Sequence, residues 1–184
     1  SISGSTLSMD ELILNQRDIP EDRWRYGLRP SAKTGCGWIA VYNCLTLLGR
    51  PKTPEEIIHG LERQVPGLHG TFGTLCLGPA ILLKKWGFSV EIQSDVRKFD
   101  EILPLGSTAI LFYYWRKGLR LGAHFVAVRR EERGFVGYNT YSNSRGPDFY
   151  GESLEGYLKK QGFFGCVLTK VFAFSCSNQS PPVL

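Results

Sequence analysis

The sequence predicts a single domain, residues 1–184, of the α+β class, in which helices come first and an antiparallel sheet follows. Between residues 36 and 86 the apolar residues recur at helical spacing. From residue 108 onward they form short, partly alternating runs separated by turn residues, which is typical of strands. A chain of 184 residues with 42% apolar and 21% charged residues is long enough and apolar enough for one well-packed domain.

Three helices are expected in the first half. The first covers residues 36–48, where small and apolar side chains return at every third or fourth position. The second begins at Thr53, because Thr53 and Glu56 form a capping box, and it ends near residue 66. The third covers residues 74–86 and leads into the sheet.

The second half is expected to form the sheet. The run at 108–115 is almost wholly apolar, which indicates a strand buried on both faces. The two runs that follow it have Gly134 in the turn between them and predict an antiparallel hairpin. The expected strands cover residues 88–93, 108–115, 121–128, 135–139 and 166–174, with short helices at 95–103 and 153–160.

Both ends of the domain are expected to be less regular. Residues 1–19 show little pattern and are interpreted as a loosely ordered N-terminal arm, and residues 175–184 as a C-terminal tail. Residues 20–35 form an irregular approach to the first helix. No run of about 18 apolar residues occurs, so we expect no membrane span.

Charge and cysteine content exclude several classes of protein. The formal charge of +5 comes from scattered cations that are not interleaved with aromatic residues, so we expect no nucleic-acid site. The five cysteines include no Cys-x-x-Cys pair, which disfavours a disulfide framework and a structural zinc site. We expect reduced thiols, a cytoplasmic location, no metal and no organic cofactor. The sequence does not indicate the oligomeric state.

One cysteine is set apart by its position. Cys36 lies between Gly35 and Gly37, at the point where the first helix begins. The unpaired N–H groups and the positive end of the helix dipole favour a thiolate there, and the glycines leave the sulfur accessible. Cys36 is therefore a candidate nucleophile, whereas Cys44 and Cys76 are interpreted as core residues.

A candidate base lies on the expected hairpin. His124 occurs in an alternating run, and a turn centred near residues 131–132 brings Asn139 of the next strand opposite residues close to it. The Asn139 amide is then able to accept the Nδ1–H of the imidazole and to hold Nε2 toward the sulfur. Asn143 and Asp148, in the loop beyond, are alternatives for this third role.

This combination resembles the papain-like superfamily of cysteine peptidases, and within it a bacterial branch, the bacteriocin-processing peptidases. The resemblance covers roughly residues 30–175. It rests on the Cys36-Gly37 helix start, on the run Gly122-Ala123-His124-Phe125-Val126 and on an Asn about fifteen residues after the histidine. It implies a papain-like fold with the Cys36 helix packed on the sheet. It also implies a Cys36–His124–Asn139 triad that cleaves a peptide or protein substrate through an acyl-enzyme.

One feature departs from that family. Its members usually carry a glutamine a few residues before the cysteine, which helps to form the oxyanion hole, but residues 28–33 contain neither Gln nor Asn. Asn15 and Gln16 lie about twenty residues upstream. Two other functions stay open. One is an acyltransferase or transglutaminase-like enzyme with the same Cys–His pair, and the other is a catalytically inactive peptide-binding module.

The substrate groove is expected beside the reactive side chains. Gly37, Gly122 and Ala123 flank them, and Trp38 and Trp115 are expected to supply aromatic surface. Trp115 ends the apolar strand just before two cations, where a peptide backbone and an acidic side chain are able to dock. Because Trp38 lies about 200° around the helix from Cys36, packing beneath the helix is the alternative for this residue.

Overall fold

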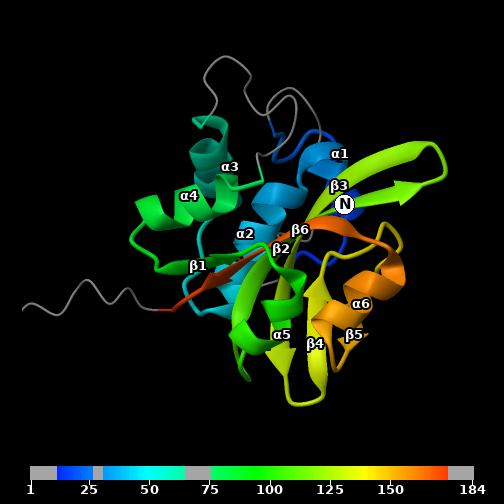
Figure 1. Ribbon diagram of the computed structural model, residues 1–184. Coiled ribbons are helices and arrows are strands. Elements are labelled where there is room, and N and C mark those ends of the chain that lie inside the picture. The colour runs from blue at the N-terminus through cyan, green and yellow to red at the C-terminus, as the bar shows by residue number, and fades with distance from the viewer. Residues whose placement is uncertain (1–11, 27–30, 65–75, 174–184) are drawn as a thin grey trace, which may run out of the picture.

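A six-stranded sheet forms the centre of the molecule. The computed structural model describes residues 12–26, 31–64 and 76–173, except for the side chains of residues 32 and 33. All neighbouring strands are antiparallel, in the order β1-β6-β2-β3-β4-β5, and helices pack on the sheet (Figure 1). This architecture confirms the predicted α+β class.

The strands are β1 (Val90–Gln93), β2 (Thr108–Lys117), β3 (Arg120–Glu131), β4 (Gly134–Tyr138), β5 (Asp148–Gly151) and β6 (Phe164–Val171). The α-helices are α1 (Ser31–Thr34), α2 (Cys36–Leu47), α3 (Pro54–Glu62), α4 (Gly78–Lys85), α5 (Phe99–Ile102) and α6 (Leu154–Gln161). Two 3-10 turns, η1 (Gln16–Asp18) and η2 (Val96–Lys98), complete the described elements. Of the described helices, none combines the length and the apolar character that crossing a membrane requires.

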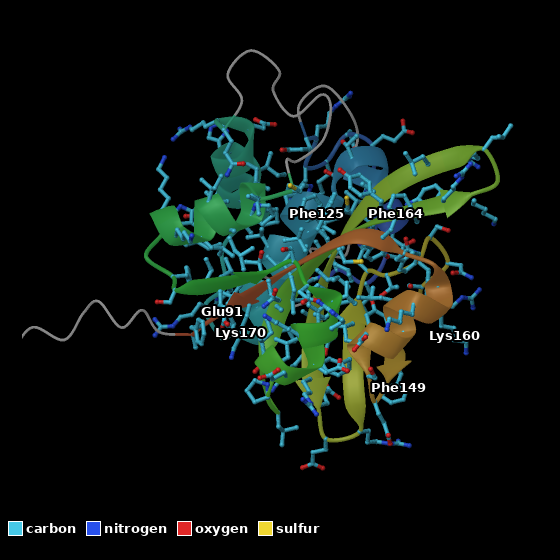
Figure 2. The ribbon with its side chains drawn as sticks, viewed as in Figure 1. Glu91, Phe125, Phe149, Lys160, Phe164 and Lys170 are labelled. Atoms are coloured by element: carbon cyan, nitrogen blue, oxygen red, sulfur yellow. The ribbon has the colours of Figure 1, made fainter. Side chains whose placement is uncertain are left out.

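The helix α2 lies between the sheet and the other helices of the first half. Every residue from Gly37 to Leu45 is buried, because α3 and α4 cover the side of α2 that faces away from the sheet. The sequence predicts that one face of this helix is buried, whereas the helix is buried on all sides from Gly37 to Leu45. Phe125 of β3, labelled in Figure 2, packs in the same cluster. This central position of α2 fixes where its first residue, Cys36, lies.

The opposite face of the sheet is covered by α5 and α6. Phe99 and Leu154 are fully buried there against Leu111 and Val126 of the central strands. Ser153 caps α6, and its hydroxyl also donates to the Asp100 carboxylate of α5 at 2.6 Å. The two helices are thus fixed to each other as well as to the sheet.

Most predicted elements occur, with small shifts at their ends. The capping box of α3 is present as predicted, with Thr53 and Glu56 bonded in both directions at 3.0 and 3.2 Å. The predicted end of this helix near residue 66 lies outside the described residues, as do the start of the next helix at residue 74 and the C-terminal tail. The sequence does not predict α1 or β5, each of which has four residues and no apolar periodicity.

The turn of the β3–β4 hairpin lies one residue further along the chain than predicted. Pairing runs from Ala127 opposite Tyr138 to Glu131 opposite Gly134, so residues 132–133 form the turn. At the other end of the hairpin, β4 ends at Tyr138, so Asn139 lies just after the strand and not on it.

Residues 12–19 do not form the loosely ordered arm that the sequence suggests. Ile13 is buried, and the Asn43 amide in the middle of α2 binds both its N–H and its carbonyl at 2.8 Å. The Asn15 amide donates to two main-chain carbonyls of the loop after β4 at 3.0 Å. Side chains distant in sequence thus hold the segment, and local spacing does not show such contacts. Residues 1–11 lie outside the described residues.

Replacing Asn43 by alanine is expected to lower the free energy of unfolding by about 2–3 kcal/mol, because the buried N–H and carbonyl of Ile13 lose their partner. Urea unfolding followed by circular dichroism measures this loss. Thr46→Ala is the matched control, since its hydroxyl bonds only the Tyr42 carbonyl of the same helix. We expect the control to change stability by less than about 0.5 kcal/mol. Equal losses in both variants would contradict the role given to Asn43.

Candidate active site

Cys36 is the first residue of α2, as predicted, and it is partly exposed. Gly35, the residue before it, provides no side-chain cap, and its own N–H donates to the Ser31 carbonyl of α1 at 2.8 Å. The Gly37 N–H lies in this first turn and donates to the Cys36 sulfur. Gly35 also permits close packing, because a β-carbon there would lie 2.5 Å from the Ser31 carbonyl oxygen and 2.9 Å from Trp38 Nε1.

The strand β3 brings His124 to this sulfur. β4 pairs with β3 only from Ala127 onward, and the start of α2 approaches β3 just before that point. The side chains of Cys36 and His124 are hydrogen-bonded, and the main-chain N–H of Phe125 also donates to the sulfur. A helix of the first half and a strand of the second thus bring the two reactive side chains into contact.

The surroundings favour the charged forms of both side chains. Burial by itself raises the pKa of Cys36, but the hydrogen bond and charge of His124, with the N–H groups of Phe125 and Gly37, outweigh it and leave this pKa below its ordinary value. Burial by itself lowers the pKa of His124, but the Cys36 thiolate and the Asn139 carbonyl leave it above its ordinary value. Both shifts favour the thiolate and imidazolium forms over the neutral pair.

The other described cysteines lack such surroundings. Cys44 is buried in the core, as predicted, and burial raises the pKa of its thiol. Cys166 is buried in β6, which raises its pKa to about 11. Cys76 is exposed, so its predicted core position is wrong; it lies in the turn before α4 and not on the apolar face of that helix. Cys176 lies outside the described residues.

Asn139 contacts His124 through its main chain. Its carbonyl oxygen lies 2.8 Å from Nε2 of the imidazole. A carbonyl only accepts hydrogen bonds, so Nε2 carries a proton and Nδ1 is the nitrogen left for the sulfur, the reverse of the predicted arrangement. Asn139 adopts φ 69°, in the left-handed region that Asn tolerates better than most residues, and this turn after β4 directs the carbonyl toward the ring.

The side chain of Asn139 binds Gln16. The Gln16 N–H donates to Asn139 Oδ1 at 2.8 Å, and Asn139 Nδ2 donates to Gln16 Oε1 at 3.1 Å. One residue therefore joins the candidate base to the segment 12–19. The sequence indicates only that Gln16 lies upstream, because its partner is 123 residues away.

Neither alternative for the third role lies on the imidazole. The Asp148 carboxylate accepts a hydrogen bond from the Ser144 hydroxyl at 2.6 Å, and Asn143 is exposed in the loop. The group described on Nε2 is the Asn139 carbonyl.

Tyr113 is a neighbour of the site that the sequence does not single out. It lies opposite His124 in the β2–β3 register, with 5.8 Å between the two ring centroids and an edge-on orientation. Its ring also stacks on Phe163 at 4.0 Å. This packing limits the movement of the imidazole. The sequence predicts both strands, at 108–115 and 121–128, but pairing them in the observed register is what would have indicated Tyr113 as a neighbour of His124.

The predicted groove residues lie in different environments. Ala123 is exposed beside His124. Gly122 lies under the ring of Trp115, and a β-carbon at Gly122 would clash with that ring. Trp115 is itself partly buried against the cluster beneath α5 and α6. The backbone at residues 122–123 is therefore open to solvent on the Ala123 side only.

Trp38 does not line a groove. Its side chain is 0% exposed, and its Nε1 donates to the Ser31 hydroxyl at 2.9 Å in the core. The prediction that Trp38 contacts substrate is wrong, because its position around α2 turns it away from Cys36. Gly37, buried in the same turn, contacts the sulfur through its N–H.

Replacing Cys36 by serine is expected to lower the pKa of His124. The thiolate that offsets burial is then absent, so the ring loses its proton at a lower pH than in the wild type. NMR titration of the His124 ring measures the shift, with the signal of the exposed His59 as internal reference. An unchanged His124 titration in Cys36→Ser would contradict the thiolate–imidazolium pair.

The comparisons with known proteins add one finding. The chain matches no family model, and no curated protein matches it. Among solved structures it is similar to the peptidase domain of Streptococcus ComA, a bi-functional ABC transporter involved in a quorum sensing pathway. The TM-score is 0.49 and the sequence identity 20%, over 80% of this chain and 98% of that chain.

Among the described residues, no three His, Cys, Asp or Glu side chains form a group that would hold a metal ion.

Proposed function

We propose that the protein is a cysteine peptidase, with Cys36 as nucleophile, His124 as general base and acid, and Asn139 as the orienting residue. The contact between Cys36 and His124 carries the proposal, because it lowers one pKa and raises the other in the way that a reactive thiolate requires. A cysteine that only fills space needs no such partner.

In the proposed reaction, the Cys36 thiolate attacks the carbonyl carbon of a peptide bond and forms a carbon–sulfur bond. The carbon–nitrogen bond then breaks, and the amine leaves with the proton of His124. His124 next takes a proton from water, whose oxygen attacks the thioester. The carboxylic acid departs, and the thiolate and imidazolium are restored. The Asn139 carbonyl holds the ring in one orientation throughout these transfers.

The oxyanion needs two donors. The main-chain N–H of Cys36, at the helix start, is proposed as the first. The Gln16 amide is proposed as the second, because η1 packs against α1, directly before Cys36, and because Asn139 fixes the Oε1 end of this amide. Gln16 would then provide from twenty residues upstream what residues 28–33 lack. With Gln16 as the donor, the lack of a glutamine at residues 28–33 would not by itself favour the inactive peptide-binding module.

Acyl transfer remains the second candidate, since the same Cys–His pair forms the same thioester. In that reaction an amine, and not water, attacks the thioester carbon. The exposed backbone at Ala123 leaves the approach to His124 open to either acceptor.

The test uses a peptide library from a digested proteome, incubated with the wild type or with Cys36→Ala. Mass spectrometry of new N-termini is expected to find cleavage products with the wild type only. A second incubation with a primary amine distinguishes the two reactions, because hydrolysis gives free carboxylates and transfer gives amides. Products that also form with Cys36→Ala, or no products with either protein, would contradict the proposal.

A further inference from the structure

The strands β2 and β3 extend beyond the rest of the sheet as a two-stranded arm (Figure 1). β6 pairs with β2 only as far as Tyr114, so residues 115–117 pair with β3 alone. We call residues 116–121 the tip of this arm. Gly118 and Leu119 form the turn, and Gly118 has the positive φ, 62°, that a two-residue hairpin of this kind needs at its first position. Nothing in the turn requires a leucine at the second position.

The tip exposes apolar side chains without a partner in the fold. Leu119 is 100% exposed and Leu121 is 64% exposed. Tyr114, at the base of the arm, is also exposed, and its ring stacks at 5.8 Å on that of Phe164, which is labelled in Figure 2. Single exposed leucines are common on protein surfaces, but here two lie one residue apart on a protruding turn, which is the kind of exposed apolar surface that interaction sites use.

The tip is also strongly cationic. It carries Arg116, Lys117 and Arg120, and no acidic residue occurs anywhere between positions 102 and 130. Lys117 lies directly opposite Arg120 in the register, a like-charge pair that destabilises the arm. None of these three residues belongs to the ion pairs found among the described residues. Arg116 Nε donates to the Gly118 carbonyl at 3.2 Å, which keeps a third cation close to the turn.

We propose that the tip of the β2–β3 arm docks on an anionic lipid surface. The cations would lie among lipid phosphates, which offsets the repulsion between Lys117 and Arg120, and the two leucines would leave water for the acyl boundary. Tyr114 and Trp115, at the base of the arm, are residue types that favour such an interface.

A lipid surface fits the tip better than a peptide does. Leu119 lies at the end of a convex turn with no surrounding wall, whereas a bound peptide or small ligand needs a groove. Arg120 and Leu121, the first two residues of β3, point to opposite faces of the ribbon, and Leu119 lies at its end, which suits insertion of the tip end-on into the lipid surface. Docking would also hold His124, five residues further along the chain, about 17 Å from the inserted Leu119.

The test is flotation of the full chain with vesicles of two compositions, equimolar phosphatidylcholine and phosphatidylglycerol or pure phosphatidylcholine. The protein is expected to float with the mixed vesicles only, and added salt is expected to release it. Leu119→Ser is expected to weaken binding about tenfold. Lys117→Glu is expected to weaken it more than about fivefold. Because Lys117→Glu replaces a like-charge pair by an opposite pair, its melting temperature is expected to stay equal or to rise.

Two matched variants control for charge and apolar area. Leu105→Ser removes a leucine that is also 64% exposed, at the other end of β2, and Arg133→Glu reverses a cation in the β3–β4 turn. Both are expected to float like the wild type, and so is Cys36→Ser, since docking does not use the thiol. Absence of binding to the mixed vesicles, or equal binding by tip variants and controls, would overturn the proposal. The proposal would also be overturned if the protein did not bind the vesicles but bound a soluble Glu-Leu-rich peptide, and if Lys117→Glu abolished that peptide binding.

Discussion

Replacing His124 by alanine is expected to lower the kcat of peptide cleavage by about 10³-fold or more. The variant loses the group that lowers the pKa of Cys36, so attack by the sulfur slows. It also loses the imidazolium that gives its proton to the leaving amine, so departure of the amine slows as well. Steady-state kinetics on a peptide identified from the library measure the loss. KM is expected to change little, because the imidazole acts mainly on the reacting atoms.

His59→Ala is the matched control for His124→Ala. His59 lies on α3, where its imidazole is exposed. Its removal is expected to leave kcat within about twofold of the wild type. A His124→Ala variant as active as this control would remove His124 from the mechanism.

Replacing Gln16 by alanine is expected to lower kcat by about 10²- to 10³-fold, which is the usual effect of losing one oxyanion donor. Alkylation of Cys36 by iodoacetamide is expected to stay close to the wild-type rate, because the contact with His124 is intact and alkylation forms no oxyanion. Arg17→Ala, in the same 3-10 turn but exposed, is the control and is expected to be as active as the wild type. If Gln16→Ala matches Arg17→Ala, the second donor lies elsewhere.

Asn139→Gly tests how Gln16 is held. Glycine keeps the carbonyl on His124 and accepts φ 69°, but it removes both hydrogen bonds to Gln16. We therefore expect Asn139→Gly to lower kcat in the same direction as Gln16→Ala, and the double variant to lose little beyond the Gln16→Ala loss. Fully additive losses would show that the two residues act separately. Asn139→Ala is less informative, because alanine is strained at this φ by about 1–2 kcal/mol.

The sequence predicts the two side chains that meet at the site because each has a local signal. Cys36 has its glycines and its helix start, and His124 has its alternating strand. For Asn139 the sequence predicts the neighbourhood but not the contacting group. Its carbonyl is directed to the ring by a left-handed φ just after the end of β4, and neither the strand's alternation nor the predicted hairpin turn indicates that conformation.

Gln16 and Trp38 show two further limits. Gln16 is fixed by Asn139, 123 residues later, and no spacing within residues 12–36 predicts that contact. The aromatic character of Trp38 suggests a groove, yet its angle around α2, which the sequence does contain, points it into the core where it is found. The fold class was easier to predict, because helices and strands occupy separate halves of the chain and each keeps its own period.

The central claim is that Cys36 is a thiolate activated by His124, and the rate of its alkylation as a function of pH tests this most directly. Iodoacetamide labelling followed by peptide mapping compares Cys36 with Cys76, which is exposed and so serves as the accessible reference. We expect Cys36 to be labelled faster than Cys76 at mildly acidic pH, and this advantage to disappear in His124→Ala. Labelling that follows exposure alone, with Cys76 ahead of Cys36 at every pH, would contradict the claim.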